Sequence, residues 1–201
     1  MPNGDIFITD RLKECSWGLI PRQSAPFARG GGSQVIVYGY PYWSASFRYE
    51  NLDDAGMREM SAWLAGRQGS RYSFLAYRPR TRLPAGGATS NSGVTLAAVD
   101  TANSELDFTG LPHALEPGDM VSYYTAASGY YCGEVVSAGA YSAGAQTVGV
   151  QPPPVAEHAS TPNPRIVEAL CEFQIEGQPQ IVETHDKRYT VSFGARQVER
   201  A

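Results

Sequence analysis

The sequence predicts a mainly β protein with one short helix and a small all-β domain inserted into it. The chain has 201 residues, of which 21 are glycine, 14 are proline and 12 are tyrosine, a composition typical of short strands joined by turns. Short runs in which apolar and polar side chains alternate recur along its length. Two segments rich in proline or glycine, Pro79–Gly87 and Gln151–Pro164, bracket a block of such runs, as the joints of an inserted domain do.

The first 33 residues show little periodicity. They include the run Gly30-Gly31-Gly32 and scattered prolines. We therefore expect residues 1–33 to form an extended N-terminal arm that becomes ordered on assembly. Trp17 and Phe27 are candidate anchors on a neighbouring subunit; the alternative is that they cover the core of their own domain.

Residues 34–82 predict strands around one helix. Gln34–Tyr38 and Tyr42–Glu50 are the first two strands, and the second alternates apolar with polar side chains, which indicates a half-buried strand. Asp53 is a suitable helix N-cap, and glycines at 66 and 69 offer the helix an exit. Arg71–Tyr77 is the next strand. The apolar stripe of the helix consists of Met57, Met60, Trp63 and Leu64.

The segment 83–164 predicts a small barrel or sandwich of its own, because five short β runs follow one another at turn-separated intervals. These runs are Val94–Val99, Glu105–Phe108, Met120–Tyr124, Tyr130–Val136 and Gln146–Val150. Alternation resumes in Arg165–Glu176 and His185–Phe193. We therefore assign residues 34–82 and 165–201 to one core unit and 83–164 to the inserted domain.

Charge and hydropathy exclude several classes of partner. The net charge is −4, so no overall basic field exists to attract nucleic acid or an anionic membrane. No apolar run approaches the roughly 20 residues of a membrane span. The N-terminus lacks the pattern of a signal peptide, and the three cysteines lie far apart in the sequence. We expect synthesis and folding in a reducing cytoplasm.

Catalytic and metal-binding patterns are not evident. His185-Asp186 could be half of a nucleophilic triad, but the run THDKR between two strands is better explained as a hairpin turn. Zinc binding would need ligands at a recognisable spacing, which the histidines and cysteines do not have: His113, His158, His185, Cys132 and Cys171. We therefore predict no enzyme activity, no catalytic residue, no cofactor and no metal.

Two clusters are candidate interaction sites. Five arginines lie in a short stretch, at Arg67, Arg71, Arg78, Arg80 and Arg82. They could contact phosphates, but contacts between subunits or an ordinary solvated face fit the acidic chain better. Four tyrosines in the inserted domain could stack on sugars, which makes a carbohydrate-binding or host-surface-binding module the alternative function: Tyr123, Tyr124, Tyr130 and Tyr131.

Several motifs together resemble one family. Ser33-Gln34-Val35 leads to Tyr42-Trp43, and the helical stretch Leu52–Leu64 precedes Gly69–Phe74. The later motifs are Leu115–Asp119, Tyr131–Val135, Gln146–Pro153 and Cys171–Ile175. In these features the chain resembles distal-tail or minor-tail proteins of long-tailed, non-contractile bacteriophages.

The resemblance implies a β-sandwich ring domain with a flanking helix and an inserted small β-barrel outside the ring. It implies a structural protein of the virion, forming a ring that joins the tail tube to the tip complex. The expected partners are further copies of the chain, the tail-tube and tail-tip hub proteins and, through the insert, a host-surface glycan. An enzyme such as a peptidoglycan hydrolase would need clustered acid and base residues, whereas the acidic residues here are scattered.

Overall fold

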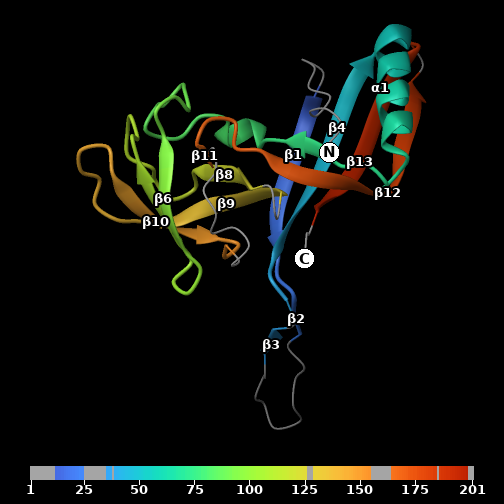
Figure 1. Ribbon diagram of the computed structural model, residues 1–201. Helices are drawn as coiled ribbons and strands as arrows, with labels where there is room; N and C mark the ends of the chain where they lie inside the picture. Colours follow the sequence, from blue (N-terminus) through green and yellow to red (C-terminus); the bar gives the residue numbers. More distant parts are fainter. Residues whose placement is uncertain are drawn as a thin grey trace.

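The fold is mainly β, with one α-helix among the residues that the structure describes (Figure 1). A computed structural model describes residues 12–24, 35–37, 39–125, 129–154, 164–184 and 186–198. The strands form an open, curled half-barrel and a nearly closed barrel, which confirms the predicted fold class.

The first sheet has five antiparallel strands and carries the helix. Its inner face is apolar because alternate residues of the second strand in the sheet, from Trp43 to Tyr49, are buried. In sheet order the strands are β1 (Leu12–Ile20), β4 (Tyr42–Leu52), β13 (Arg188–Gln197), β12 (Cys171–Thr184) and β5 (Phe74–Ala76).

Helix α1 (Asp54–Arg67) packs on this inner face. It begins as predicted, because the Asp53 side chain accepts a hydrogen bond from the backbone N–H of Gly56 at 2.9 Å. It ends at Gln68, which adopts the left-handed conformation with φ 49°. The helix therefore stops at neither of the two glycines proposed as its exit.

The second sheet forms the barrel. Its core contains Leu106, Phe108, Val121 and Val148, all buried. In sheet order the strands are β11 (Pro164–Arg165), β8 (Met120–Thr125), β9 (Gly129–Ala138), β10 (Gln146–Gln151), β7 (Glu105–Thr109) and β6 (Thr95–Asp100). A short 3₁₀ helix, η1 (Pro79–Thr81), lies on the connection from β5 to β6.

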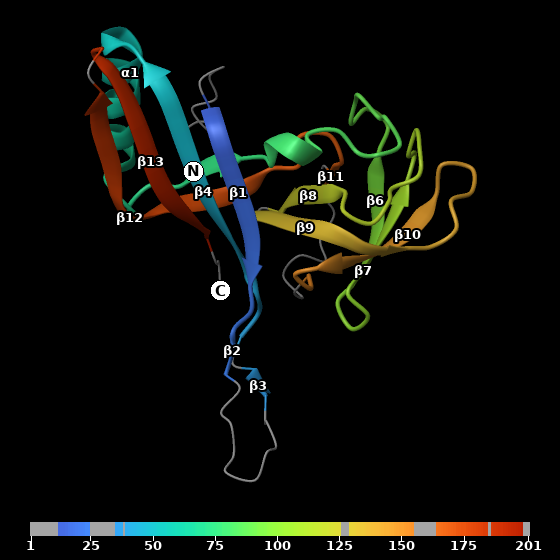
Figure 2. The same cartoon turned by 180° about the vertical axis from the view of Figure 1, so that it is seen from behind.

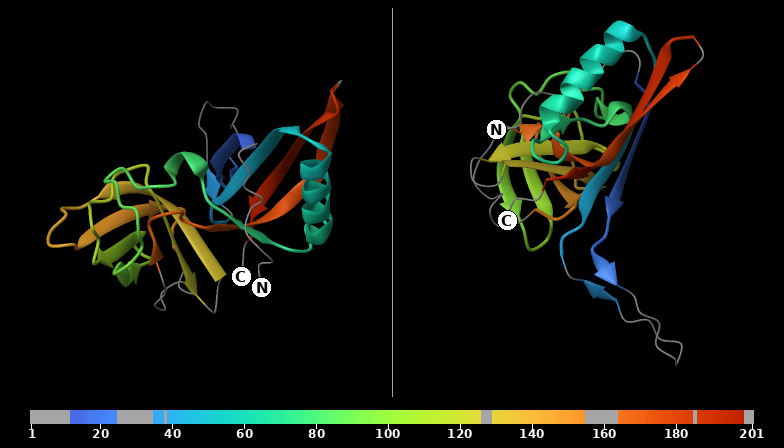
Figure 3. Two further views of the ribbon diagram at one scale, coloured as in Figure 1. Left: turned by 90° about the horizontal axis from the view of Figure 1, so that it is seen from above. Right: turned by 90° about the vertical axis from the view of Figure 1, so that its right-hand side faces the viewer.

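The barrel and the helix cover the same face of the first sheet (Figure 3). Met120 and Cys132 from the barrel belong to the first hydrophobic core. The Trp43 indole N–H also donates to the backbone carbonyl of Cys132 at 3.0 Å. The opposite face of the sheet carries small polar side chains, including Ser16 and Ser46, whose hydroxyls lie 2.9 Å apart.

The N-terminal region differs from the expected arm. Leu12–Ile20 is the edge strand β1, which pairs with β4 along its length. The alternating apolar residues Cys15, Trp17 and Leu19 pack against the first core, so burial of this stripe holds the strand on the sheet. The proposed strand Gln34–Tyr38 is confined, within the described residues, to β3 (Ile36–Val37), which pairs with β2 (Gln23–Ser24).

The predicted hairpin turn is confirmed at the end of the sheet. β12 ends at Thr184, β13 begins at Arg188, and these two residues pair. His185 itself lies outside the described residues.

Candidate interaction surfaces

An apolar ribbon projects from one end of the first sheet (Figure 1). It consists of β2 and β3 with the residues at their base, and its large apolar side chains are exposed: Ile20, Val35, Ile36, Val37 and Tyr40. Val37 is 69% exposed. A two-stranded ribbon alone is marginally stable in water, so this element has the character of a contact arm.

Two arginines lie at the base of the apolar ribbon. The guanidinium carbons of Arg22 and Arg196 lie 5.3 Å and 5.8 Å from the ring centre of Tyr42, within cation–π range. Gly39 leaves room for Arg22, because a Cβ there would approach the Arg22 Cδ to 2.8 Å. The base of the ribbon is therefore positively charged.

The hairpin of β12 and β13 projects from the opposite end of the first sheet (Figure 2). We call residues 176–184 of β12 and 188–191 of β13 the projecting hairpin. Ile181 and Val182 are 50% and 56% exposed. Ile181 pairs with the buried Val191 and lies on the face that carries the helix, whereas Val182 pairs with Thr190 and lies on the opposite face. Glu176 and Glu183 on the same strand are also exposed.

The five candidate arginines are not one surface. Arg67 is buried, donates to the Ser73 carbonyl at 3.0 Å and stacks over Trp63 at 4.9 Å. Burial lowers the pKa of its guanidinium, although arginine stays protonated at any physiological pH. The prediction of Arg67 as a subunit contact is therefore wrong, because its side chain is used inside the fold.

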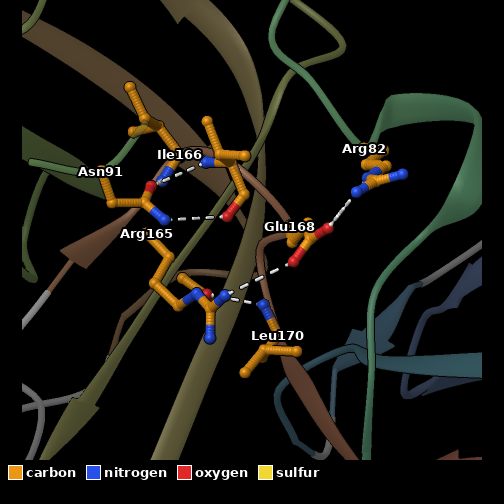
Figure 4. Close-up of polar contacts among 8 residues, drawn as sticks. Arg82, Asn91, Arg165, Ile166, Glu168 and Leu170 are labelled. Atoms are coloured by element: carbon orange, nitrogen blue, oxygen red, sulfur yellow. Dashed lines mark hydrogen bonds and ion pairs between the residues drawn. The ribbon is translucent and has the colours of Figure 1, made fainter. Parts of the chain in front are cut away.

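Two further arginines bind within the chain, at the junction of the two sheets. Arg82 binds Glu168 with both Nε and a terminal nitrogen at 2.8 Å, and Arg165 lies 3.7 Å from the other carboxylate oxygen (Figure 4). Arg78 contacts Glu134 on β9 at 3.3 Å. Charge pairs expected between subunits thus join parts of one subunit.

Asn91 fixes the returning chain at the same junction. Its Oδ1 accepts from the backbone N–H groups of Ile166 and Val167 at 2.8 and 2.9 Å, and its amide donates to the Val167 carbonyl at 3.1 Å (Figure 4). The backbone N–H of Leu170 donates to the Ser122 hydroxyl at 2.8 Å. The sequence did not predict that Asn91 binds the backbone of a distant segment, because an isolated Asn between turn residues also fits an ordinary loop.

Arg71 and Arg80 remain exposed. Arg71 donates to the side chain of Gln68 at 3.2 Å and lies 5.5 Å from the ring centre of Tyr72. Of the five arginines proposed as one surface, Arg71, Arg80 and Arg82 are exposed.

Trp17 and Phe27 were the two aromatic residues proposed as anchors on a neighbouring subunit. Trp17 is half-buried, and its ring meets Phe173 edge-on at 4.9 Å, so it covers the core of its own domain, as the alternative proposed. Its indole N–H donates to the Cys15 sulfur at 3.1 Å. Phe27 lies outside the described residues.

The tyrosine cluster divides between core and surface. Tyr123 and Tyr131 are buried and stack on each other with ring centres 4.7 Å apart. The Tyr131 hydroxyl donates to the Pro152 carbonyl at 2.7 Å, and burial raises its pKa well above the ordinary value. The prediction that these two bind a surface ligand is wrong. Tyr124 is exposed, and its ring centre lies 5.1 Å from that of Tyr130.

Within the described residues, no three histidine, cysteine or acidic side chains gather in a way that could hold a metal ion. Cys132 and Cys171 are buried, and Cys15 is half-buried. Burial raises the pKa of the Cys15 thiol to about 11. His113 is exposed, and His158 lies outside the described residues.

Comparison of the sequence with protein-family models and with curated proteins yields no match. Among the described residues, no helix has the length and apolar character needed to cross a membrane.

Proposed function

We propose that this protein is a structural subunit of a phage tail, forming with further copies a ring between the tail tube and the tip complex. The observation that carries the proposal is the exposure of large apolar side chains on the apolar ribbon, which extends beyond one end of the first sheet. Clusters of this kind mark interaction sites on soluble proteins. The motif resemblance to distal-tail proteins supports the assignment to a tail.

The edge of the first sheet adds a second line of support. The outer edge of β1 has no neighbouring strand among the described residues, and its nine-residue sequence contains no proline. An open edge of this length is a hazard for a protein that stays monomeric. Burial in a closed assembly removes the hazard.

The proposal is tested by measuring the mass of the protein in solution and the symmetry of the particles that it forms. Light scattering over a range of concentrations measures the mass in solution, and electron microscopy of the purified protein and of virions reports the symmetry and position. We expect ring-shaped oligomers, or monomers that become incorporated into tails. A protein that stays monomeric at every concentration and is missing from purified virions would contradict the proposal.

We infer that this role requires no catalytic side chain. Asp186 lies in the turn between β12 and β13, and His113 is exposed in the loop before β8. Asp186→Ala and His113→Ala phages should therefore keep wild-type infectivity. Well-formed mutant particles that adsorb but fail to infect would instead support a chemical role.

A second candidate is binding of a host-surface carbohydrate by the barrel. The exposed Tyr124 beside Tyr130 offers a small aromatic platform, of the kind that stacks on apolar faces of ligands. Tyr124→Ala should abolish binding of the purified protein to a glycan array. Tyr40→Ala, which removes an exposed tyrosine on the apolar ribbon, is the matched control and should leave glycan binding intact.

A further inference from the structure

Two buried cysteines meet where the barrel contacts the first sheet. Cys132 lies on β9 and Cys171 lies on β12, and these two strands are in direct contact. Both side chains are fully buried in the first hydrophobic core. We propose that Cys132 and Cys171 are a thiol pair that a peroxide converts to a disulfide in the folded protein. The bond would join the barrel covalently to the first sheet. This inference goes beyond the proposed function and does not depend on it.

The two sulfur atoms are neighbours in the reduced protein. The Cys171 thiol donates a hydrogen bond to the Cys132 sulfur. A disulfide forms without backbone movement only where two cysteines lie close together and their side chains are directed at each other. A hydrogen bond between the two thiols meets this requirement for the side chains, so the bond can form while both strands keep their places.

Hydrogen bonds hold both backbones at this position. Ser122 on β8 pairs with Cys132 in the barrel sheet. The Ser122 hydroxyl also accepts a hydrogen bond from the backbone N–H of Leu170, the residue before Cys171, at 2.8 Å. The Trp43 indole N–H donates to the Cys132 carbonyl at 3.0 Å. The thiols are therefore held side by side by the packing of the strands that carry them, in addition to their own contact.

The reaction needs one peroxide for each pair of thiols. The sulfur of one cysteine attacks an oxygen of hydrogen peroxide, the O–O bond breaks, and the released hydroxide takes the thiol proton as water, which leaves a sulfenic acid. The sulfur of the other cysteine then attacks the sulfenic sulfur. The S–S bond forms, the S–O bond breaks, and the second hydroxide takes the second thiol proton as water. The thiols thus lose two electrons, which reduce the peroxide to water.

Burial slows the first step and favours the second. The thiolate is the reactive form of cysteine, and burial, together with the hydrogen bond to Cys132, raises the pKa of Cys171 well above its ordinary value. The first oxidation therefore requires a local opening of the core. Once one sulfur is a sulfenic acid, the adjacent thiol competes with further peroxide, so we expect the disulfide in place of a sulfinic acid.

The experiment treats the folded full-length protein with hydrogen peroxide, removes the peroxide, and alkylates the remaining thiols with iodoacetamide in urea. Mass spectrometry counts the alkylated cysteines, and peptide mapping without reductant identifies the linked pair. The same treatment of protein unfolded in urea shows how the three cysteines pair without the fold. Cys15→Ser is the matched control, because it removes the half-buried third cysteine and leaves the pair intact.

We expect the folded wild type to lose the mass of two hydrogens and to be alkylated at Cys15 alone. The cross-link between Cys132 and Cys171 should exceed the other pairings roughly tenfold or more, because the fold holds these two sulfurs together. Cys15→Ser should form the same cross-link, and dithiothreitol should reverse it. Oxidation should raise the urea midpoint of both proteins, since a cross-link restricts the unfolded chain, whereas Cys171→Ala should show no rise.

Three results would overturn the thiol pair. The first is recovery of Cys132 and Cys171 as separate alkylated or sulfinic residues after oxidation of the folded protein. The second is a mixture of pairings equal to that from the unfolded protein. The third is an equal rise in urea midpoint for oxidised Cys171→Ala, which would assign the stabilisation to another modification. The tail assignment is decided separately, by the presence or absence of the protein in virions.

Discussion

Replacing Trp63 with alanine should lower the free energy of unfolding by about 2–4 kcal/mol. Trp63 lies on the sheet-facing side of α1, where its ring centre is 5.2 Å from that of Phe74 and 5.7 Å from that of Phe193. Truncation of a fully buried tryptophan costs about 3–5 kcal/mol. Because Trp63 is half-buried, we expect the lower part of that range or slightly less.

Part of the loss would act through Arg67. Its guanidinium stacks on the Trp63 ring at 4.9 Å in a buried position, so alanine at position 63 removes the surface that covers this charge. Trp63→Phe is the matched control, because it keeps an aromatic ring. The indole N–H of Trp63 is buried and has no hydrogen-bond partner among the described residues. Its removal therefore breaks no bond, and Trp63→Phe should cost less than about 1.5 kcal/mol.

Urea unfolding followed by circular dichroism measures both values, with the slope of the transition checked for constancy. A change below about 1 kcal/mol for Trp63→Ala would refute the assignment of Trp63 to the core. Equal losses for the alanine and phenylalanine variants would contradict the role given to ring stacking.

Three further predictions concern the junction and the thiols. Asn91→Ala should destabilise the protein by about 2–3 kcal/mol in urea unfolding, because it leaves three backbone groups of Ile166 and Val167 without their partner; Ser90→Ala, which removes one exposed hydrogen bond, should cost under about 1 kcal/mol. A double-mutant cycle on Arg78 and Glu134, which are partly exposed, should give a coupling of about 1 kcal/mol or less that shrinks in high salt; a coupling above about 2 kcal/mol would contradict this. The Cys15 thiol should react slowly with iodoacetamide below pH 9 and faster toward pH 11, since burial raises its pKa to about 11. Because folding raises the pKa of Cys15, the protonated thiol contributes fully to the free energy of unfolding below pH 9.0, the unfolded pKa, and this contribution falls as the pH rises through 11. A free energy of unfolding that increases between pH 9 and 11 would contradict this prediction.

Local patterns predicted most of the secondary structure. The alternation in Tyr42–Glu50 and the Asp53 N-cap correspond to β4 and to the start of α1. The period of apolar residues specifies which face of an element is buried, and a capping side chain acts within a few residues. The strand β1 was missed because Gly18 and polar neighbours weaken the alternation of Cys15, Trp17 and Leu19. Strand β1 is stabilised by hydrogen bonds to β4, which lies elsewhere in the sequence.

The interaction residues were less predictable. Arginine and tyrosine clusters suggested surfaces, yet Arg67, Tyr123 and Tyr131 are buried. Side chains close in sequence on a strand point to opposite faces, which explains why Tyr123 is enclosed while Tyr124 is exposed. The aliphatic run QVIVY predicted a strand, and its central residues Val35, Ile36 and Val37 are exposed. Exposure of an apolar run depends on whether another layer covers it, and that layer is distant in sequence.

The sequence by itself determined the β-rich class, helix α1 and its N-cap, and the hairpin turn between β12 and β13, because these depend on the intrinsic preferences of neighbouring residues. Tertiary structure decided that Arg78 and Arg82 bind Glu134 and Glu168 within one chain. It also decided that Trp17 completes a core and that aliphatic side chains remain exposed at both ends of the first sheet. These features result from contacts between segments as many as 154 positions apart, as between Trp43 and Gln197, and no local pattern encodes such a contact.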